Sequence, residues 1–109
     1  MTSPDRWREL TDAVIGHVAK PAGAVSVEEW ADALTPDAFR LFYGPTRAVE
    51  LGHGATMEVV TRGTQSCDGR IEDHGILVHG GSDESITATS ARALAAALTE
   101  AAREIESLR

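Results

Sequence analysis

The chain has 109 residues and a mass of 11.6 kDa, enough for one domain built around one modest hydrophobic core. Apolar residues make up 42% and charged residues 25%, which is typical of soluble globular domains and excludes a disordered or fibrous chain. The formal net charge of −7 argues against ordinary nucleic-acid binding and against an anionic membrane surface. The single cysteine, Cys67, excludes an internal disulfide framework.

The cellular location is predicted from what the chain lacks. No run approaches the roughly 20 apolar residues of a membrane-spanning helix. The first residues, MTSPDR, do not have the cationic and then apolar order of a signal peptide. We therefore expect a cytoplasmic protein that does not enter the membrane.

The first 47 residues carry two or three helix signals. Ser3-Pro4-Asp5 is typical of a helix start, and that helix is expected to end before Pro21. Ser26 and Glu29 have the spacing of a capping box, which predicts a second helix over 26–34. A proline follows a threonine cap at 35–36, so a third short helix, or a kinked continuation of the second, is expected to reach the Gly-Pro pair at 44–45.

The middle of the chain changes to an alternating pattern, which predicts an antiparallel hairpin over about 56–79. Asp68-Gly69 is typical of a type I′ turn. Counting outward from this turn opposes Val59 to Val78, Thr61 to Ile76, Glu58 to His79, and Gln65 to Glu72. A bulge at Gly75 would change this count. A further strand is expected at 48–51.

The last element is predicted to be a helix over about 88–108, capped by Thr87. Its apolar residues recur at spacings of three and four and form one narrow stripe. The expected fold is therefore α+β: a small antiparallel sheet packed by a long C-terminal helix, with two or three short N-terminal helices. We expect a single domain over 1–109, with a helical portion at 1–47 and a hairpin-plus-helix portion at 48–109.

Two groups of residues are candidates for contact with a protein partner. The stripe of the last helix has the spacing of a short coiled-coil seam, so Leu94, Leu98, Ile105 and Leu108 serve either a homodimer or the monomer core. Phe42 and Tyr43, which precede the Gly-Pro pair, are candidates for an exposed aromatic knob. Together with the small core, these groups favour a non-enzymatic protein–protein interaction module that forms a homodimer.

Two alternatives remain open at this stage. The first is a small metal-binding protein or enzyme, since imidazole and carboxylate groups bind zinc and related ions. Its candidate ligands are His74, His79, Glu58 and Asp73. The second is an acidic inhibitor whose spaced carboxylates imitate nucleic-acid phosphates. No catalytic residues and no cofactor are predicted.

The C-terminal half also resembles known proteins. The segment 86–98, ITATSARALAAAL, followed by Ala101, Ala102 and Glu104, is similar to the C-terminal segment of small uncharacterised proteins of actinobacteria and their phages. In those proteins such a helix follows an acidic hairpin, so the resemblance covers the chain from about Met57 onward. It implies the type of host and a compact α+β shape, and it supplies no catalytic residues.

Overall fold

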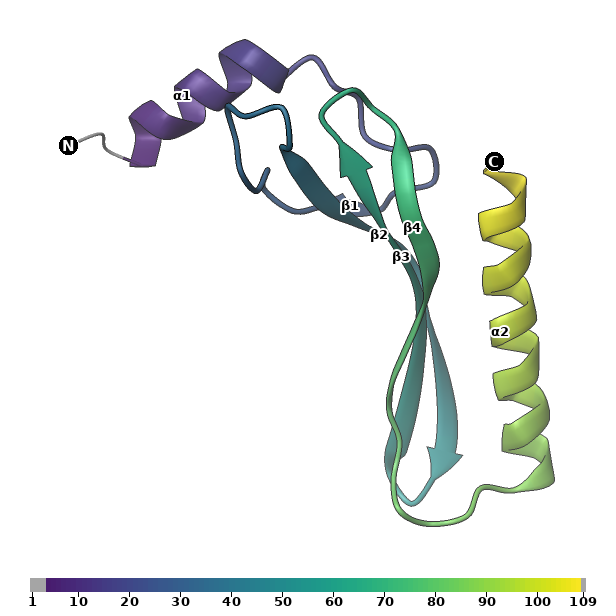
Figure 1. Ribbon diagram of the computed structural model, residues 1–109. Coiled ribbons are helices and arrows are strands. Elements are labelled where there is room, and N and C mark those ends of the chain that lie inside the picture. The colour runs from purple at the N-terminus through teal and green to yellow at the C-terminus, as the bar shows by residue number, and fades with distance from the viewer. Residues whose placement is uncertain (1–3, 109) are drawn as a thin grey trace.

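The computed structural model describes residues 4–108 of the chain, which form two helices and one four-stranded antiparallel sheet (Figure 1). In the sheet the strands follow their order in the sequence, β1-β2-β3-β4. The α+β class and the helix packed on the sheet are confirmed. The elements are α1 (Pro4–Ile15), β1 (Ser26–Val27), β2 (Phe39–Gly52), β3 (Ala55–Ser66), β4 (Ile71–Gly80) and α2 (Ala88–Ser107).

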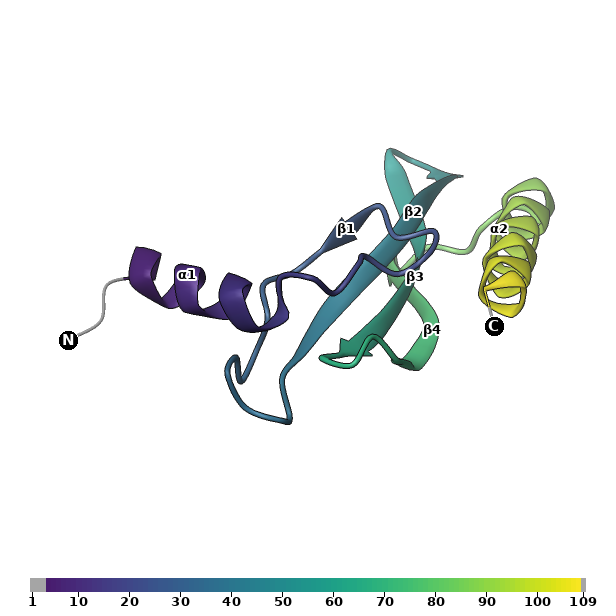
Figure 2. The same ribbon diagram turned by 90° about the horizontal axis from the view of Figure 1, so that it is seen from above.

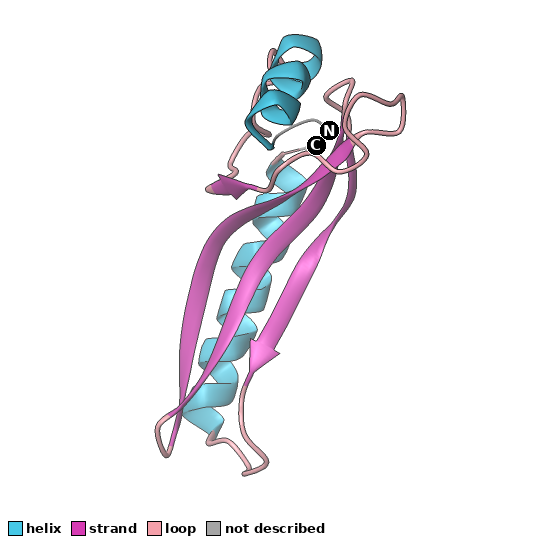
Figure 3. Ribbon diagram, turned by 90° about the vertical axis from the view of Figure 1, so that its left-hand side faces the viewer, coloured by secondary structure: helices cyan, strands magenta, loops and turns pink. Residues whose placement is uncertain are grey.

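The molecule is long and flat, with extents of 55 × 32 × 17 Å. Helix α2 runs along one face of the sheet, and no helix of the described chain covers the other face (Figure 3). Helix α1 projects from the far end of the sheet, so that the two helices lie on opposite sides of it when seen from above (Figure 2). Neither helix is long and apolar enough to cross a membrane.

The N-terminal portion holds one helix where two or three were predicted. The first predicted helix is confirmed as α1, although it ends at Ile15 and the Ser3 cap lies outside the described residues. The predicted helix over 26–34 is wrong. Backbone N–H groups of Val25, Glu28 and Ala31 donate instead to carbonyl groups of β2, so this segment lies along the edge of that strand. Tertiary pairing thus outweighs the capping-box pattern.

The predicted third helix is also wrong, because residues from Phe39 onward form β2. Thr35 and Pro36 make a turn, in which the Thr35 hydroxyl donates to the Asp32 carbonyl oxygen at 2.7 Å. After this turn burial alternates, with Arg40 and Phe42 on the sheet face that carries α2 and Phe39 and Leu41 on the opposite face. The Gly-Pro pair at 44–45 does not end the element; it lies at a register shift inside β2. The expected strand at 48–51 is the second half of this same strand, which therefore crosses the predicted boundary at residue 47.

The β3–β4 register is confirmed over the lower half of the sheet, which is the half nearer the β2–β3 turn. Val59 pairs with Val78, Thr61 with Ile76, and Glu58 with His79. Beyond Arg62 a bulge changes the count, so Gln65 pairs with Ile71 and not with Glu72. The extra residue lies at Asp73 and His74, near the predicted Gly75, and Asp73 has a positive φ of 50°.

The turn between these strands is built on Asp68-Gly69, as predicted, but it is not a type I′ turn. Gly69 alone of the two has a positive φ, of 91°. The Asp68 carboxylate accepts hydrogen bonds from the Ser66 hydroxyl and from the Arg70 backbone N–H. These bonds hold the pKa of Asp68 below its usual range because they favour the charged form.

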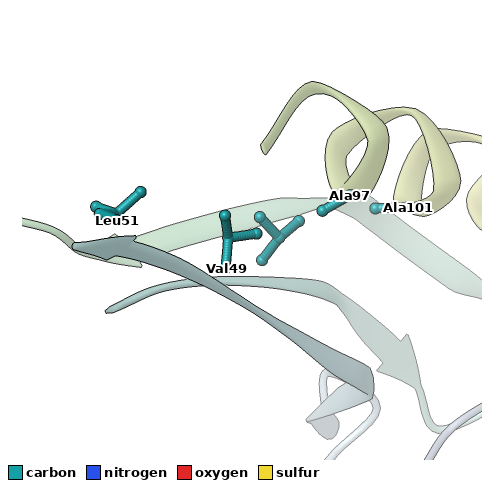
Figure 4. Packing of buried hydrophobic residues seen from close by; sticks show 5 residues of the cluster. Val49, Leu51, Ala97 and Ala101 are labelled. Atoms are coloured by element: carbon teal, nitrogen blue, oxygen red, sulfur yellow. The ribbon is translucent and has the colours of Figure 1, made fainter. Parts of the chain in front are cut away.

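The core lies between α2 and the lower half of the sheet. Val49 and Leu51 of β2 and Val59 of β3 pack with Ala97 and Ala101 of α2 (Figure 4). Because the helix presents alanine here, its backbone approaches the sheet closely and small side chains fill the interface. The predicted Thr87 cap is confirmed, since its hydroxyl accepts a hydrogen bond from the Ser90 N–H at 3.1 Å.

Two strand glycines differ sharply in the space around them, which allows a matched test of packing. A Cβ at Gly63 would lie 2.5 Å from Phe42 Cζ, whereas a Cβ at Gly75 would meet nothing within 4 Å. We expect Gly63→Ala to lower the free energy of unfolding by about 1–3 kcal/mol through overpacking. Gly75→Ala should be neutral or slightly stabilising. Urea denaturation of both variants checks this, and equal effects would contradict the packing described.

Candidate functional site

The four predicted metal ligands are not brought together into one site. His79 and Glu58 form the expected cross-strand pair, with Nε2 and Oε2 3.2 Å apart, on the sheet face away from α2. His74 lies on the other face, where its ring meets Phe42 edge-on with centroids 5.2 Å apart. Asp73 is exposed at the bulge. Within residues 4–108 no group of three or more His, Cys, Asp or Glu side chains is placed to hold a metal ion.

Most of the predicted interface residues belong to the core of the monomer. Ile105 is buried, and Leu94 and Leu98 pack against the cluster between α2 and the sheet. Leu108 is half-exposed and contacts the loop at Gly23, where a Cβ would lie 3.1 Å from its Cδ1. The helical stripe therefore serves the monomer core, which was the second of the two roles predicted for it.

The predicted aromatic knob does not exist as an exposed pair. Phe42 is 2% exposed and lies on the sheet face that carries α2, in contact with Gly63 and His74. Tyr43 points to the opposite face, where its hydroxyl donates to Glu28 at 3.2 Å. Burial, and then the hydrogen bond to Glu28, raise the pKa of Tyr43 above its usual range. The two aromatic residues alternate as strand residues do, so they cannot form one surface.

Strand β4 supplies an open sheet edge. It forms one margin of the sheet, and no described strand pairs with its outer side (Figure 3). Three consecutive apolar residues, Ile76, Leu77 and Val78, lie in its lower half; Ile76 is 38% exposed and Val78 42% exposed. Both of these lie on the face that carries α2, because they pair with Thr61 and Val59. The upper half of the strand differs, since Glu72, Asp73 and the bulge make it charged and bent.

The opposite margin of the sheet, formed by the short β1 and by the part of β2 that β1 does not reach, is partly covered. The upper half of β2 pairs with β1 and with the backbone on either side of it. At its lower half α2 makes two side-chain contacts with this margin: the Ser90 hydroxyl donates to the Glu50 carbonyl oxygen at 3.0 Å, and Arg47 forms an ion pair with Glu100 at 3.3 Å. Natural sheets protect their edges in such ways. The lower half of β4 has no such protection within residues 4–108.

A second feature is a cleft of about 340 Å³ between α1 and the segment that follows β1. Both tryptophans of the chain, Trp7 and Trp30, line it, as does the buried side chain of Arg40. Acidic residues, among them Asp12 and Glu28, also contribute to its wall. A pocket of this size accommodates a small molecule.

Comparison with known proteins adds no assignment. No protein-family model, no curated protein and no solved structure matches this chain. The edge strand and the cleft are therefore the features of the molecule that bear on its function.

Sequence reasoning named neither of these two features. The alternating pattern placed Ile76 and Val78 correctly on the apolar face, but the outermost position of β4 depends on the strand order. Arg40 was not predicted as a site residue because its segment was expected to be a helix. Had the segment FRLFY been predicted as a strand, alternation would have placed Arg40 on the inward face and indicated a buried cation.

Proposed function

We propose that this chain is a non-enzymatic protein–protein interaction module that forms a homodimer through β4. The single observation that carries the proposal is an unpaired edge strand with a partly exposed apolar run, Ile76-Leu77-Val78. An exposed edge strand pairs readily with another strand, and its half-exposed side chains gain burial when it does so. A second copy presents the same edge, so pairing about a two-fold axis closes the assembly at two chains.

The residues of β4 favour one pairing register. Directly opposed residues in antiparallel strands share a face, so a two-fold axis perpendicular to the sheet passes midway between the two copies of one residue, which are then opposite each other. An axis at Leu77 opposes Ile76 to the partner's Val78 twice and the two Leu77 side chains to each other. An axis at Ile76 would oppose Val78 to a histidine, and an axis at Val78 would oppose Ile76 to a glycine.

Charge supports the same register. With the axis at Leu77, the paired stretch runs from His74 to Gly80 and contains no carboxylate. Glu72 and Asp73 lie beyond it, so neither copy places an acid opposite an apolar residue of the other. Moving the axis to Gly75 would oppose Asp73 to Leu77. The dimer would be one continuous antiparallel sheet of eight strands, with both α2 helices on the same face.

The test is the oligomeric state of two matched variants. We expect native mass spectrometry and sedimentation at low micromolar concentration to give twice the chain mass for the unmodified protein. Ile76→Lys should yield a monomer, because a lysine would then face Val78 at two symmetric places. Ile71→Lys is the control: the same residue type on the same strand, 41% exposed, but outside the paired stretch. It should remain dimeric.

Two results would overturn the proposal. An unmodified protein that stays monomeric would remove the homodimer, and an Ile76→Lys variant that stays as dimeric as the control would remove β4 as its interface. Circular dichroism of both variants establishes that the fold is intact, since each substituted side chain is already about two-fifths exposed. A dimer joined by apolar pairing also persists at high salt, whereas an acidic inhibitor loses its partner there.

A further inference from the structure

The cleft beside α1 contains a buried cation without a counter-charge. Arg40 is 8% exposed, and the described residues give it no ion pair. Burial alone lowers the pKa of Arg40, with no carboxylate acting against that effect. An arginine nevertheless keeps its charge in a protein. Its positive field is therefore available to a ligand that reaches it.

Three of the hydrogen bonds of this guanidinium go to neutral oxygens. Nε donates to Gln65 Oε1 at 2.8 Å, and Nη2 donates to the carbonyl oxygens of Val18 and Ala19 at 3.1 and 3.2 Å. These bonds fix the orientation of the planar group. Nη1 has no hydrogen-bond partner within residues 4–108. It is not completely buried, so a ligand or solvent can reach it. Because Arg40 lines the cleft, its unpaired Nη1 is the nitrogen left to bond a ligand there.

The cleft offers flat apolar walls as well as this donor. Arg40 lies over the ring of Trp30, with Cζ 4.5 Å from the ring centroid. Trp7 comes from α1 and is 49% exposed, so much of its ring is uncovered. Tryptophan rings provide large apolar surfaces that pack against planar groups. The combination of a fixed cationic donor and two indoles fits an acid attached to a flat apolar body.

The other charges limit the number of negative charges on the ligand. Asp12, Glu28 and Glu29 also line the cleft, against Arg8 and Arg40. Glu29 is paired with Arg8 at 3.4 Å, which leaves two carboxylates and one cation without an ion pair. This excess of one carboxylate repels polyanions such as nucleic acid or multiply charged phosphates most strongly, so a ligand with a single carboxylate at Nη1 fits the cleft better than they do.

We propose that this cleft binds a small monocarboxylate bearing a flat apolar group, with the carboxylate on Arg40 and the flat group against Trp7 and Trp30. This site does not depend on the β4 dimer, which lies at another part of the sheet.

Phenylacetate is a suitable probe, and phenylacetamide is its matched neutral control. The chain has two tryptophans and both line the cleft, so their indole N–H signals in nitrogen-15 NMR spectra report on it directly. We expect phenylacetate to shift both signals in a saturable way. Phenylacetamide should bind at least about tenfold more weakly, because a charge-assisted hydrogen bond is much stronger than a neutral one. Equal binding of the two probes, or shifts that never saturate, would overturn the proposal.

Two variants keep the test independent of folding. Trp7→Ala removes a half-exposed side chain and should weaken phenylacetate binding at least severalfold with an unchanged fold. Arg40→Lys keeps the charge but loses the planar fork and should weaken it further. Arg62→Lys is the control, since Arg62 lies exposed on the opposite face of the sheet and should bind like the unmodified protein. If Trp7→Ala retained full affinity, the probe would not lie in this cleft.

Discussion

Replacing Glu104 with alanine is expected to lower the free energy of unfolding by about 3 kcal/mol. The Glu104 carboxylate, 17% exposed, accepts hydrogen bonds from Arg47 Nη2 at 3.1 Å and from the buried Thr61 hydroxyl. It ties α2 to β2 and β3 together. Its loss would leave Arg47 without its less exposed partner, and Arg47 Nη1 is already buried without a hydrogen bond in the described chain. Urea denaturation followed by circular dichroism measures the effect.

Glu100 is the matched control for this prediction. It contacts the same arginine from the same helix, with its Oε2 3.3 Å from Arg47 Nε, but its side chain is 64% exposed. Because exposed ion pairs contribute little, we expect Glu100→Ala to cost about 0.5 kcal/mol or less. If both variants lost the same stability, burial of the Glu104 contact would not be what joins the helix to the sheet.

The C-terminal half of the fold was predictable because local patterns there agree with the tertiary structure. The helix from Ala88 was recognisable from its stripe and its threonine cap, and the hairpin register followed from counting outward from Asp68-Gly69. The count failed above Arg62, where the bulge adds one residue to β4. A bulge is specified by backbone packing around Asp73 and His74, and alternation alone does not locate it.

The N-terminal half was mispredicted because its local signals compete with pairing along β2. The capping-box spacing of Ser26 and Glu29 is real, yet three backbone hydrogen bonds to β2 are gained only in the extended form. Likewise the Gly-Pro pair at 44–45 reads as a helix end, whereas the fold uses it to bend a long strand. Gly44 is needed there because a Cβ would meet Thr61 and Glu104. Such requirements become visible only when distant segments are in place.

The candidate sites depend even more strongly on topology. Side-chain chemistry suggested the histidine group, and the five-residue spacing of His74 and His79 already predicts opposite faces of a strand, where the sheet places them. The edge position of β4 and the burial of Arg40 follow from which strands are neighbours and from where the loop at Val18 and Ala19 lies. The edge of β4 is a candidate because its outer backbone groups have no neighbouring strand, and the cleft is a candidate because the buried Arg40 has no ion pair among the described residues.

Replacing Phe42 with alanine is expected to lower the free energy of unfolding by about 3–5 kcal/mol. Its ring is 2% exposed and lies against Gly63, which has no side chain to fill the space that would be left. The neighbouring Tyr43→Ala is the control: it removes an aromatic ring of similar size from the other face, together with one exposed hydrogen bond to Glu28. We expect it to cost about 1 kcal/mol.

The two aromatic variants also separate a core role from an interface role. Unfolding of a dimer depends on protein concentration, whereas unfolding of an isolated domain does not, so both variants should be denatured at two concentrations. If Phe42 is a core residue, Phe42→Ala loses the same stability at each concentration and keeps the concentration dependence of the unmodified protein. If it contacted a partner instead, the loss would appear as weaker association with little change in the monomer. The burial of Phe42 under the face that carries α2 predicts the first result, since a ring enclosed by its own chain stabilises the fold whether or not a second copy is bound.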